Sequence, residues 1–259
     1  MTTKFNSVWV SSAARTGSMW TTNVVREIFL SAHYDIFPKN QIQSDLEWLN
    51  LYKSEAEIDQ NDKNRYVLKI HSGLPSVPNY SKIITNIRNP YDICASFHEF
   101  MKCDVNSSID SALKLSTFVN HYKKFSNDIL IIRYEEIEDH PKMLINKLAL
   151  FCNTKLSKIQ IKNICIKYNK KNVVKLIKKN DENLKQTIHL NQKIDQQKIV
   201  NFNNGNYRSF DLDTGFQSGH ISSRKTGEWK KVFSNEEAKD IIEKIDSLAI
   251  ELGYASEKN

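Results

Sequence analysis

The chain has 259 residues, of which 40% are hydrophobic and 26% charged, so it can bury a substantial core and general disorder is excluded. No apolar run approaches the roughly 18 residues needed to cross a bilayer, and the opening residues lack the apolar segment of a secretory signal. We therefore expect a cytoplasmic protein without stable membrane insertion. The four cysteines form no C-x-x-C pair and no cluster with histidine, so we expect free thiols and no bound metal.

The net charge of +7 is unevenly spread. Lys155 to Lys198 holds twelve Lys, no Arg and three acidic residues, a net charge of +9. A lysine block of this kind can serve an anionic ligand or partner. The alternative is a general preference for Lys, because the whole chain has 30 Lys against 7 Arg. Both interpretations stay open.

Short apolar runs predict four buried strands, over Ser7 to Ser12, Tyr66 to Ile70, Lys82 to Ile87 and Ile129 to Ile132. Helical spacing and start signals predict helices over Ser18 to Leu30, Tyr91 to Lys102, Ile109 to Phe125, Pro141 to Phe151 and Glu236 to Leu252. Short apolar strands that alternate with helices are typical of an α/β fold with a central parallel sheet flanked by helices. We expect a single domain over residues 1 to 259. The polar stretch from Asp181 to Phe216 is expected to contain a long loop or lid.

The first strand runs into a tight turn and a helix start at Ala14-Arg-Thr-Gly-Ser-Met-Trp20. Backbone N–H groups and the positive end of the helix dipole converge there, which favours an anion. The turn is not the G-x-x-x-x-G-K-[ST] loop of nucleotide triphosphatases, because Ser18 follows Gly17 and the cation, Arg15, precedes it. The sequence therefore predicts a P-loop-like phosphate site and argues against Mg-nucleotide phosphoryl transfer.

Three further motifs lie at strand ends or near the C-terminus. Lys69-Ile-His71 ends a strand, Arg88-Asn-Pro-Tyr-Asp-Ile-Cys-Ala-Ser96 ends another and opens a helix, and Arg224-Lys-Thr-Gly-Glu-Trp-Lys230 stands near the C-terminus. In this order the four motifs resemble the cytosolic-type sulfotransferase family, whose members use 3′-phosphoadenosine 5′-phosphosulfate (PAPS). Family chains carry K-S-G-T-T-W, K-T-H, R-N-P-x-D-x-x-x-S and R-K-G-x-x-G-D-W-K. The resemblance spans about Val8 to Phe233.

The resemblance implies which residues bind PAPS. Those expected to hold the 5′-phosphosulfate are Arg15, Thr16, Gly17, Ser18 and Met19. Trp20 would lie against the adenine, and Tyr168 falls where relatives have an adenine-stacking aromatic. Tyr134 matches a family Tyr that contacts the purine or the 3′-phosphate.

The 3′-phosphate is what separates PAPS from ATP analogues, and the resemblance assigns it to Arg88 and Ser96, with Arg224 and Lys225 as a further pair. The last motif is out of register, because aligning on Gly227 puts Ser222 and Ser223 opposite the family Arg-Lys. The first loop also departs from the pattern: Arg15 replaces the family Lys, which keeps the charge but not the compact ammonium geometry.

The resemblance further implies in-line transfer of a sulfuryl group from PAPS to a hydroxyl or amine, with 3′,5′-ADP as product. His71 is the predicted general base, because only His titrates near neutrality without help. Lys69 points to the same face of its strand and would, with Arg15, neutralise the leaving group. Fixed cations would then do the work that Mg does in kinases, so no metal is expected.

Other functions stay open, namely an ATP-using P-loop-type kinase and a non-enzymatic nucleotide- or nucleic-acid-binding protein. We expect no nucleic-acid partner, because the lysine block has only Tyr168 where a stacking platform would interleave aromatics. The acceptor would be a small molecule or a glycan, and the lysine block would suit an acidic one. The loops expected to choose it are Asp35 to Lys63, Asp104 to Asp110 and Asp181 to Phe216. The sequence does not indicate whether the protein is a monomer or an oligomer.

Overall fold

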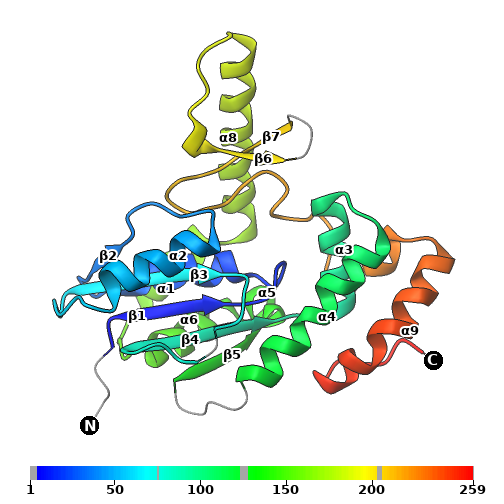
Figure 1. Ribbon diagram of the computed structural model, residues 1–259, viewed down its shortest axis with the longest axis horizontal. Coiled ribbons are helices and arrows are strands. Elements are labelled where there is room, and N and C mark those ends of the chain that lie inside the picture. The colour runs from blue at the N-terminus through cyan, green and yellow to red at the C-terminus, as the bar shows by residue number, and fades with distance from the viewer. Residues whose placement is uncertain (1–4, 75, 123–127, 203–205, 259) are drawn as a thin grey trace.

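A five-stranded parallel sheet forms the centre of the protein in the computed structural model, which describes residues 5–74, 76–122, 128–202 and 206–258 (Figure 1). The strand order is β2–β3–β1–β4–β5. The strands are β1 (Ser7–Ser11), β2 (Asp35–Phe37), β3 (Asn64–Ile70), β4 (Ser81–Ile87) and β5 (Ile129–Arg133). The four predicted strands and the α/β class are confirmed, and the three-residue β2 adds an edge strand.

Helices cover both faces of this sheet. On one face pack α1 (Ser18–Ser31), α6 (Pro141–Phe151) and α7 (Lys158–Lys167). On the other pack α2 (Asp45–Leu51), α3 (Pro90–Met101), α4 (Val105–Tyr122) and α9 (Asn235–Glu251). In the central strand, Val8 packs in one core cluster and its neighbour Trp9 in the other, because successive strand residues point to opposite faces. A strand buried on both faces reads as a continuous apolar run, which is why the sequence revealed it.

Two of the segments expected to be acceptor loops are partly regular structure. Residues 35–63 contain β2, α2 and a short π-helix, η1 (Tyr52–Ala56). The expectation of a loop over residues 104–110 is wrong, because α4 already begins at Val105 and Asp104 accepts a hydrogen bond from the Ser107 N–H at its start (2.8 Å). Residues 123–125, the predicted end of α4, lie outside the described residues.

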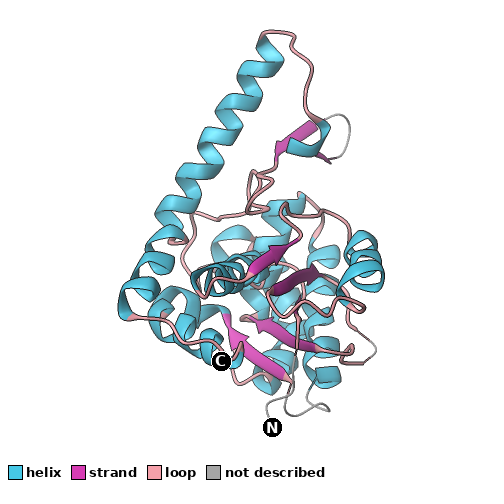
Figure 2. Cartoon of the chain, turned by 90° about the vertical axis from the view of Figure 1, so that its left-hand side faces the viewer, coloured by secondary structure: helices cyan, strands magenta, loops and turns pink. Residues whose placement is uncertain are grey.

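The largest difference from the sequence prediction is α8 (Lys170–His189), which projects from the body of the molecule (Figure 2). The polar stretch from Asp181 to Phe216, expected to contain a long loop or lid, is therefore helical up to His189 and irregular only beyond it, at residues 190–195 and from residue 210. Val173, Ile177, Leu184 and Ile188 recur along α8 at helical spacing, although only Val173 and Ile177 are buried, so the sequence did carry a helical pattern that the prediction missed among the many polar residues. The chain returns through η2 (Gln196–Lys198) and an antiparallel hairpin of β6 (Ile199–Phe202) and β7 (Asn206–Ser209).

Residues 210–222, which we call the lid loop, then lead from the hairpin back to the edge of the main sheet. The remaining short elements are α5 (Tyr134–Asp139) and η3 (Trp229–Val232). Among the described residues, no helix has the length and apolar character required to span a membrane.

Candidate active site

The predicted motifs meet at one edge of the sheet. The loop after β1 carries Arg15, and His71, Arg88 and Tyr134 lie just beyond the carboxyl ends of β3, β4 and β5. These strands are adjacent and parallel, so their carboxyl ends converge, where α/β folds bind their ligands. A cavity of about 610 Å³ lies there. Twelve of the fourteen predicted residues line it: Arg15, Gly17, Ser18, Met19, Trp20, Lys69, His71, Arg88, Ser96, Tyr134, Tyr168 and Arg224.

The turn before α1 has the shape of a phosphate-binding loop. Gly17 has a φ of 88°, and a Cβ at this position would lie 2.8 Å from Ile137 Cδ1 and 2.9 Å from Tyr134 Cδ2, so a side chain would displace the wall of the cavity. Buried Thr16 does not line the cavity but donates its hydroxyl to the carbonyl of Ala13 (2.7 Å). The first intrahelical bond runs from residue 21, which leaves the N–H groups of residues 18–20 without intrahelical acceptors.

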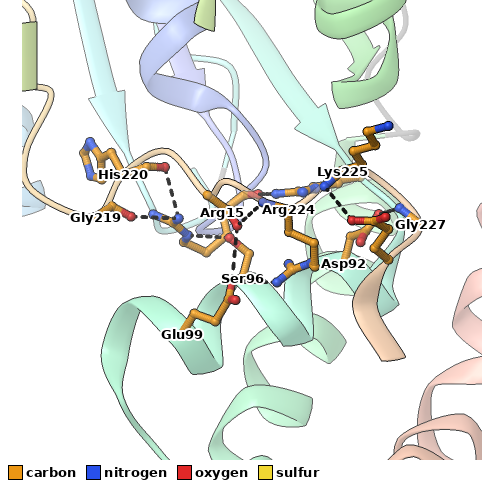
Figure 3. A network of polar contacts seen from close by, with 12 residues as sticks. Arg15, Asp92, Ser96, Glu99, Gly219, His220, Arg224, Lys225 and Gly227 are labelled. Carbon is orange, nitrogen blue, oxygen red and sulfur yellow. Dashed lines mark hydrogen bonds and ion pairs between the residues drawn. The ribbon is translucent and has the colours of Figure 1, made fainter. Parts of the chain in front are cut away.

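The Arg15 side chain contacts four groups, among them the carbonyl of Gly219 at 3.5 Å from its Nη2 (Figure 3). Its Nε donates to Ser96 Oγ (3.0 Å), and its Nη2 donates to the carbonyl of His220 (3.1 Å). The guanidinium also lies over the ring of Phe100, 4.2 Å from the centroid. Burial, and then the neighbouring charge of Arg88, lower the pKa of Arg15 to about 9. The predicted phosphosulfate cation is thus tied to α3 and to the lid loop.

Two further arginines carry unused hydrogen-bond donors into this region. Arg88 stacks on Tyr134, 4.0 Å from the ring centroid, and its Nη1 donates to the carbonyl of Arg15 (3.1 Å). Arg224 forms an ion pair with Glu99 through Nη1 (2.6 Å). Within the described part of the chain, Nε of Arg88 and both Nε and Nη2 of Arg224 are buried without a hydrogen-bond partner. Buried donors of this kind are rare and costly, so an anion held between these two arginines fits the site.

The loop that carries Arg224 is anchored to α3 and α5. The N–H of Gly227 donates to Asp92 (2.8 Å), and the hydroxyl of Thr226 donates to Glu138 (2.5 Å). Burial raises the pKa of Asp92. Lys225 is exposed, does not line the cavity, and uses its backbone N–H to bond Glu228 (3.1 Å; Figure 3). The structure therefore brings Arg224 to the cavity but not Lys225.

Two aromatic residues bound the end of the cavity next to α1. The Trp20 indole N–H donates to the carbonyl of Tyr168 (3.2 Å), and the Tyr168 hydroxyl donates to Glu27 (3.0 Å). Both rings are largely buried, and burial followed by the charge of Glu27 raises the pKa of Tyr168. Their fixed positions suit contact with a flat base.

His71 is held in one tautomer. Its Nδ1 lies 3.0 Å from the carbonyl oxygen of Ser12, which can only accept, so the proton is on Nδ1. Nε2 is then the acceptor, and Lys69 Nζ lies 2.9 Å from it. The backbone N–H of His71 donates to Asp45 Oδ2 (2.9 Å), a contact that no sequence motif marks. The ring is thereby presented with its basic nitrogen free for proton transfer once Lys69 moves.

The surroundings of the cavity also shift the pKa values of His71 and Lys69. The His71 side chain is exposed at the cavity, and desolvation by the surrounding protein, then the charge of Lys69, lower its pKa to about 3. Desolvation likewise lowers the pKa of Lys69 to about 8, with Asp45 opposing the shift. At neutral pH His71 is therefore uncharged, as a general base must be.

Another part of the cavity lining is apolar and carries no predicted site residue. Its rings and aliphatic side chains come from α3, from the segment before α2, and from the hairpin and the lid loop: Ile42, Phe97, Phe100, Met101, Val200, Phe210, Phe216 and Ile221. Residues far away in the sequence hold the lid loop in place. The side chain of Asn23 donates to the carbonyl of Thr214 (2.7 Å), and the N–H of Gln41 donates to the carbonyl of Leu212 (2.6 Å). In the described part of the chain no group of three His, Cys, Asp or Glu side chains is placed to hold a metal ion.

Comparison with known proteins identifies the chain. The family model of the sulfotransferase domain matches residues 5–252, so the chain belongs to that family, which confirms the resemblance seen in its motifs. It is accordingly a transferase whose chemistry is sulfuryl transfer. A search of curated protein sequences gave no match.

Two solved structures share the fold. A retinol dehydratase in complex with retinol and PAP is 18% identical, with 96% of this chain and 82% of that chain covered and a TM-score of 0.56. Mouse sulfotransferase SULT7A1 complexed with PAP is 14% identical, with coverages of 94% and 84% and a TM-score of 0.58.

Proposed function

We propose that the protein transfers a sulfuryl group from PAPS to a hydroxyl or amine of a small acceptor and releases 3′,5′-ADP. The observation that carries this is the set of buried guanidinium donors on Arg88 and Arg224 that lack acceptors among the described residues. A 3′-phosphate would satisfy them through charge-assisted hydrogen bonds, whereas the hydroxyl of ATP at the same position would not. The PAP bound in both structural neighbours supports the same nucleotide.

The rest of the cavity accommodates the remaining parts of the nucleotide. Ser96 would add its hydroxyl to the 3′-phosphate, and Lys225 would join only if its side chain turned toward the cavity. The N–H groups of Gly17 to Met19, on a loop shaped by Thr16, suit the 5′-phosphosulfate. Trp20 and Tyr168 would hold the adenine, with Tyr134 at its edge beside the stacked Arg88.

The chemistry asked of the protein is proton removal and charge neutralisation. PAPS, when bound, supplies the sulfuryl group that passes to the acceptor atom, while the phosphate oxygen keeps the bonding electrons. His71 Nε2 takes the acceptor proton, and the Nδ1–H···O=C bond to Ser12 holds the ring in place as it becomes charged. Lys69 and Arg15 offset the charge that develops on the phosphate side. These cations need no metal ion to help them.

The acceptor is proposed to be a small molecule with an apolar body, because rings from α3 and the lid loop line the same cavity as His71. A glycan remains the alternative. The preference for an acidic acceptor, based on the lysine block, stays a prediction: the block lies on α7, on α8 and in the segment after it, and only Lys170 of it lines the cavity.

Thermal unfolding with three ligands tests the proposal. At 100 times its dissociation constant, 3′,5′-ADP should stabilise the protein by about 2.7 kcal/mol, and 5′-ADP at the same concentration by much less. Equal stabilisation by 5′-ADP would contradict the 3′-phosphate site, and stabilisation by single-stranded DNA alone would favour a nucleic-acid-binding protein. Transfer of label from radiolabelled PAPS to a panel of alcohols, phenols and amines then tests the reaction itself.

A further inference from the structure

A second histidine, His220 of the lid loop, lines the same cavity as His71. The backbone N–H of Gln217 donates to its Nδ1 at 3.2 Å. Because a backbone N–H can only donate, Nδ1 must be unprotonated, and the neutral ring therefore carries its proton on Nε2. Among the described residues, nothing accepts a hydrogen bond from that Nε2–H.

The two histidines of the cavity thus have opposite tautomers. His71 carries its proton on Nδ1, which bonds Ser12, and its Nε2, which now accepts from Lys69, can take a proton. His220 presents an N–H, which can only donate while the ring is neutral. The backbone around each ring fixes this difference, so the two side chains cannot exchange roles.

The surroundings of His220 keep it neutral. Its ring packs against Phe100 (5.4 Å between centroids) and edge-on against Phe216 (6.3 Å). Burial first, and then the charges of Arg15 and Lys69, hold its pKa well below the usual range. A neutral donor set in an apolar wall is suited to an uncharged oxygen, whereas the anionic sulfuryl group has Lys69 and Arg15 beside it.

We propose that His220 positions the acceptor substrate by donating its Nε2–H to an uncharged oxygen close to the reacting hydroxyl or amine. The proposal rests on the proposed function and adds a specificity determinant to it: an acceptor with a second oxygen is favoured over its carbon isostere. His71 removes the proton from one polar group of the acceptor, and His220 holds the other.

The tautomer is tested without any nucleotide. Protein labelled with ¹⁵N-histidine is recorded by two-bond ¹H–¹⁵N correlation at pH 7, and the two rings are assigned from His220→Phe and His71→Gln. We expect the Nε2–H form for His220 and the Nδ1–H form for His71. An Nδ1–H form or a charged ring at His220 would overturn the proposal.

The binding role is tested with two matched phenols, 2-methoxyphenol and 2-ethylphenol, and radiolabelled PAPS. Wild type should prefer the methoxy compound about fivefold to tenfold in kcat/KM, the usual worth of one neutral hydrogen bond, mainly through KM. His220→Phe should abolish the preference, and His220→Gln, which retains an N–H donor, should restore part of it. His189→Phe, at the exposed end of α8, is the control and should keep the full preference.

Three results would overturn this role: a preference that survives in His220→Phe, an equal slowing of both phenols in that variant, or turnover of neither phenol by wild type that binds 3′,5′-ADP. The thermal shift with 3′,5′-ADP is measured on every variant. Absence of that shift in wild type would count against the proposed function, whereas its presence with a failed phenol test would count against His220 alone.

Discussion

The two walls of the cavity are built in different ways. The wall proposed for the nucleotide consists of strand ends, the turn before α1 and the start of α3, and its functional groups are cations and backbone N–H groups. The other wall consists largely of apolar side chains, several of them from the lid loop, which long-range contacts such as Asn23 to Thr214 hold in place. The first wall is fixed by the sheet itself, and the second by tertiary contacts. Substitutions that affect nucleotide binding and acceptor turnover separately therefore test whether each wall has the role proposed for it.

The largest expected effect concerns the boundary between the walls, where His71 stands. His71→Ala should lower turnover by about 10²–10⁴-fold, because the acceptor proton would lose its base. Affinity for 3′,5′-ADP should barely change, since the His71 ring contacts neither Arg88 nor Arg224, the proposed ligands of the 3′-phosphate, and the cation Lys69 stays in place.

Steady-state kinetics with radiolabelled PAPS and calorimetry with 3′,5′-ADP measure the two quantities. His189→Ala, at the exposed end of α8, serves as the control. A His71 variant that kept most of its rate would remove the residue from the mechanism, and one that failed to fold would mark it as a structural residue.

A smaller effect is expected within the nucleotide wall. Arg88→Ala should weaken binding of 3′,5′-ADP by roughly 1.5–3 kcal/mol, about 10-fold to 150-fold in Kd, the usual worth of charge-assisted hydrogen bonds. Binding of 5′-ADP should change little. Arg65→Ala, at the amino-terminal end of β3 and stacked on Tyr34, is the matched control. Equal losses for both nucleotides would show that Arg88 supports the fold of the site and not the 3′-phosphate.

The smallest effect concerns the approach to the apolar wall. If the acceptor is acidic, kcat/KM should fall as salt rises from low to moderate concentration while kcat changes little, because surface charge acts on encounter and is screened over about 8 Å at physiological salt. Replacing Lys171, Lys178 and Lys179 by Gln should flatten this dependence. Lys170 is left in place because it lines the cavity. An unchanged salt response in the triple variant would assign these lysines to a solvated helix face.

The nucleotide wall was predictable because its information is local. Arg15, His71 and Arg88 each lie within a few residues of a buried strand, and parallel pairing of those strands brings them together. The position of Lys225 was less predictable, because the conformation of the loop at residues 224–228 depends on hydrogen bonds to Asp92 and Glu138, which lie on helices distant in the sequence.

The apolar wall could not be read in the same way. Phe210 and Phe216 reach the cavity only because hydrogen bonds from α1 and from the segment before α2 hold the lid loop over it, and such contacts have no sequence spacing. Asp181, taken for the start of a loop, lies in α8 and accepts a hydrogen bond from Ser209 (2.6 Å) at the base of the hairpin. The apolar residues of α8 do recur at helical spacing, but its mean hydropathy is low and polar residues outnumber them, which made the helix easy to mistake for an irregular segment.

The hydrogen bonds of Arg15 to the lid loop have a thermodynamic consequence. If binding of a phosphosulfate draws the guanidinium off the carbonyl of His220, the nucleotide and this one contact of the lid loop compete for the same side chain. Competition of this kind is reciprocal: whatever factor nucleotide binding exerts on lid release, a ligand that secures the lid exerts on nucleotide affinity. On the proposed function, the nucleotide and the acceptor would then be linked energetically through Arg15, even if they never touch.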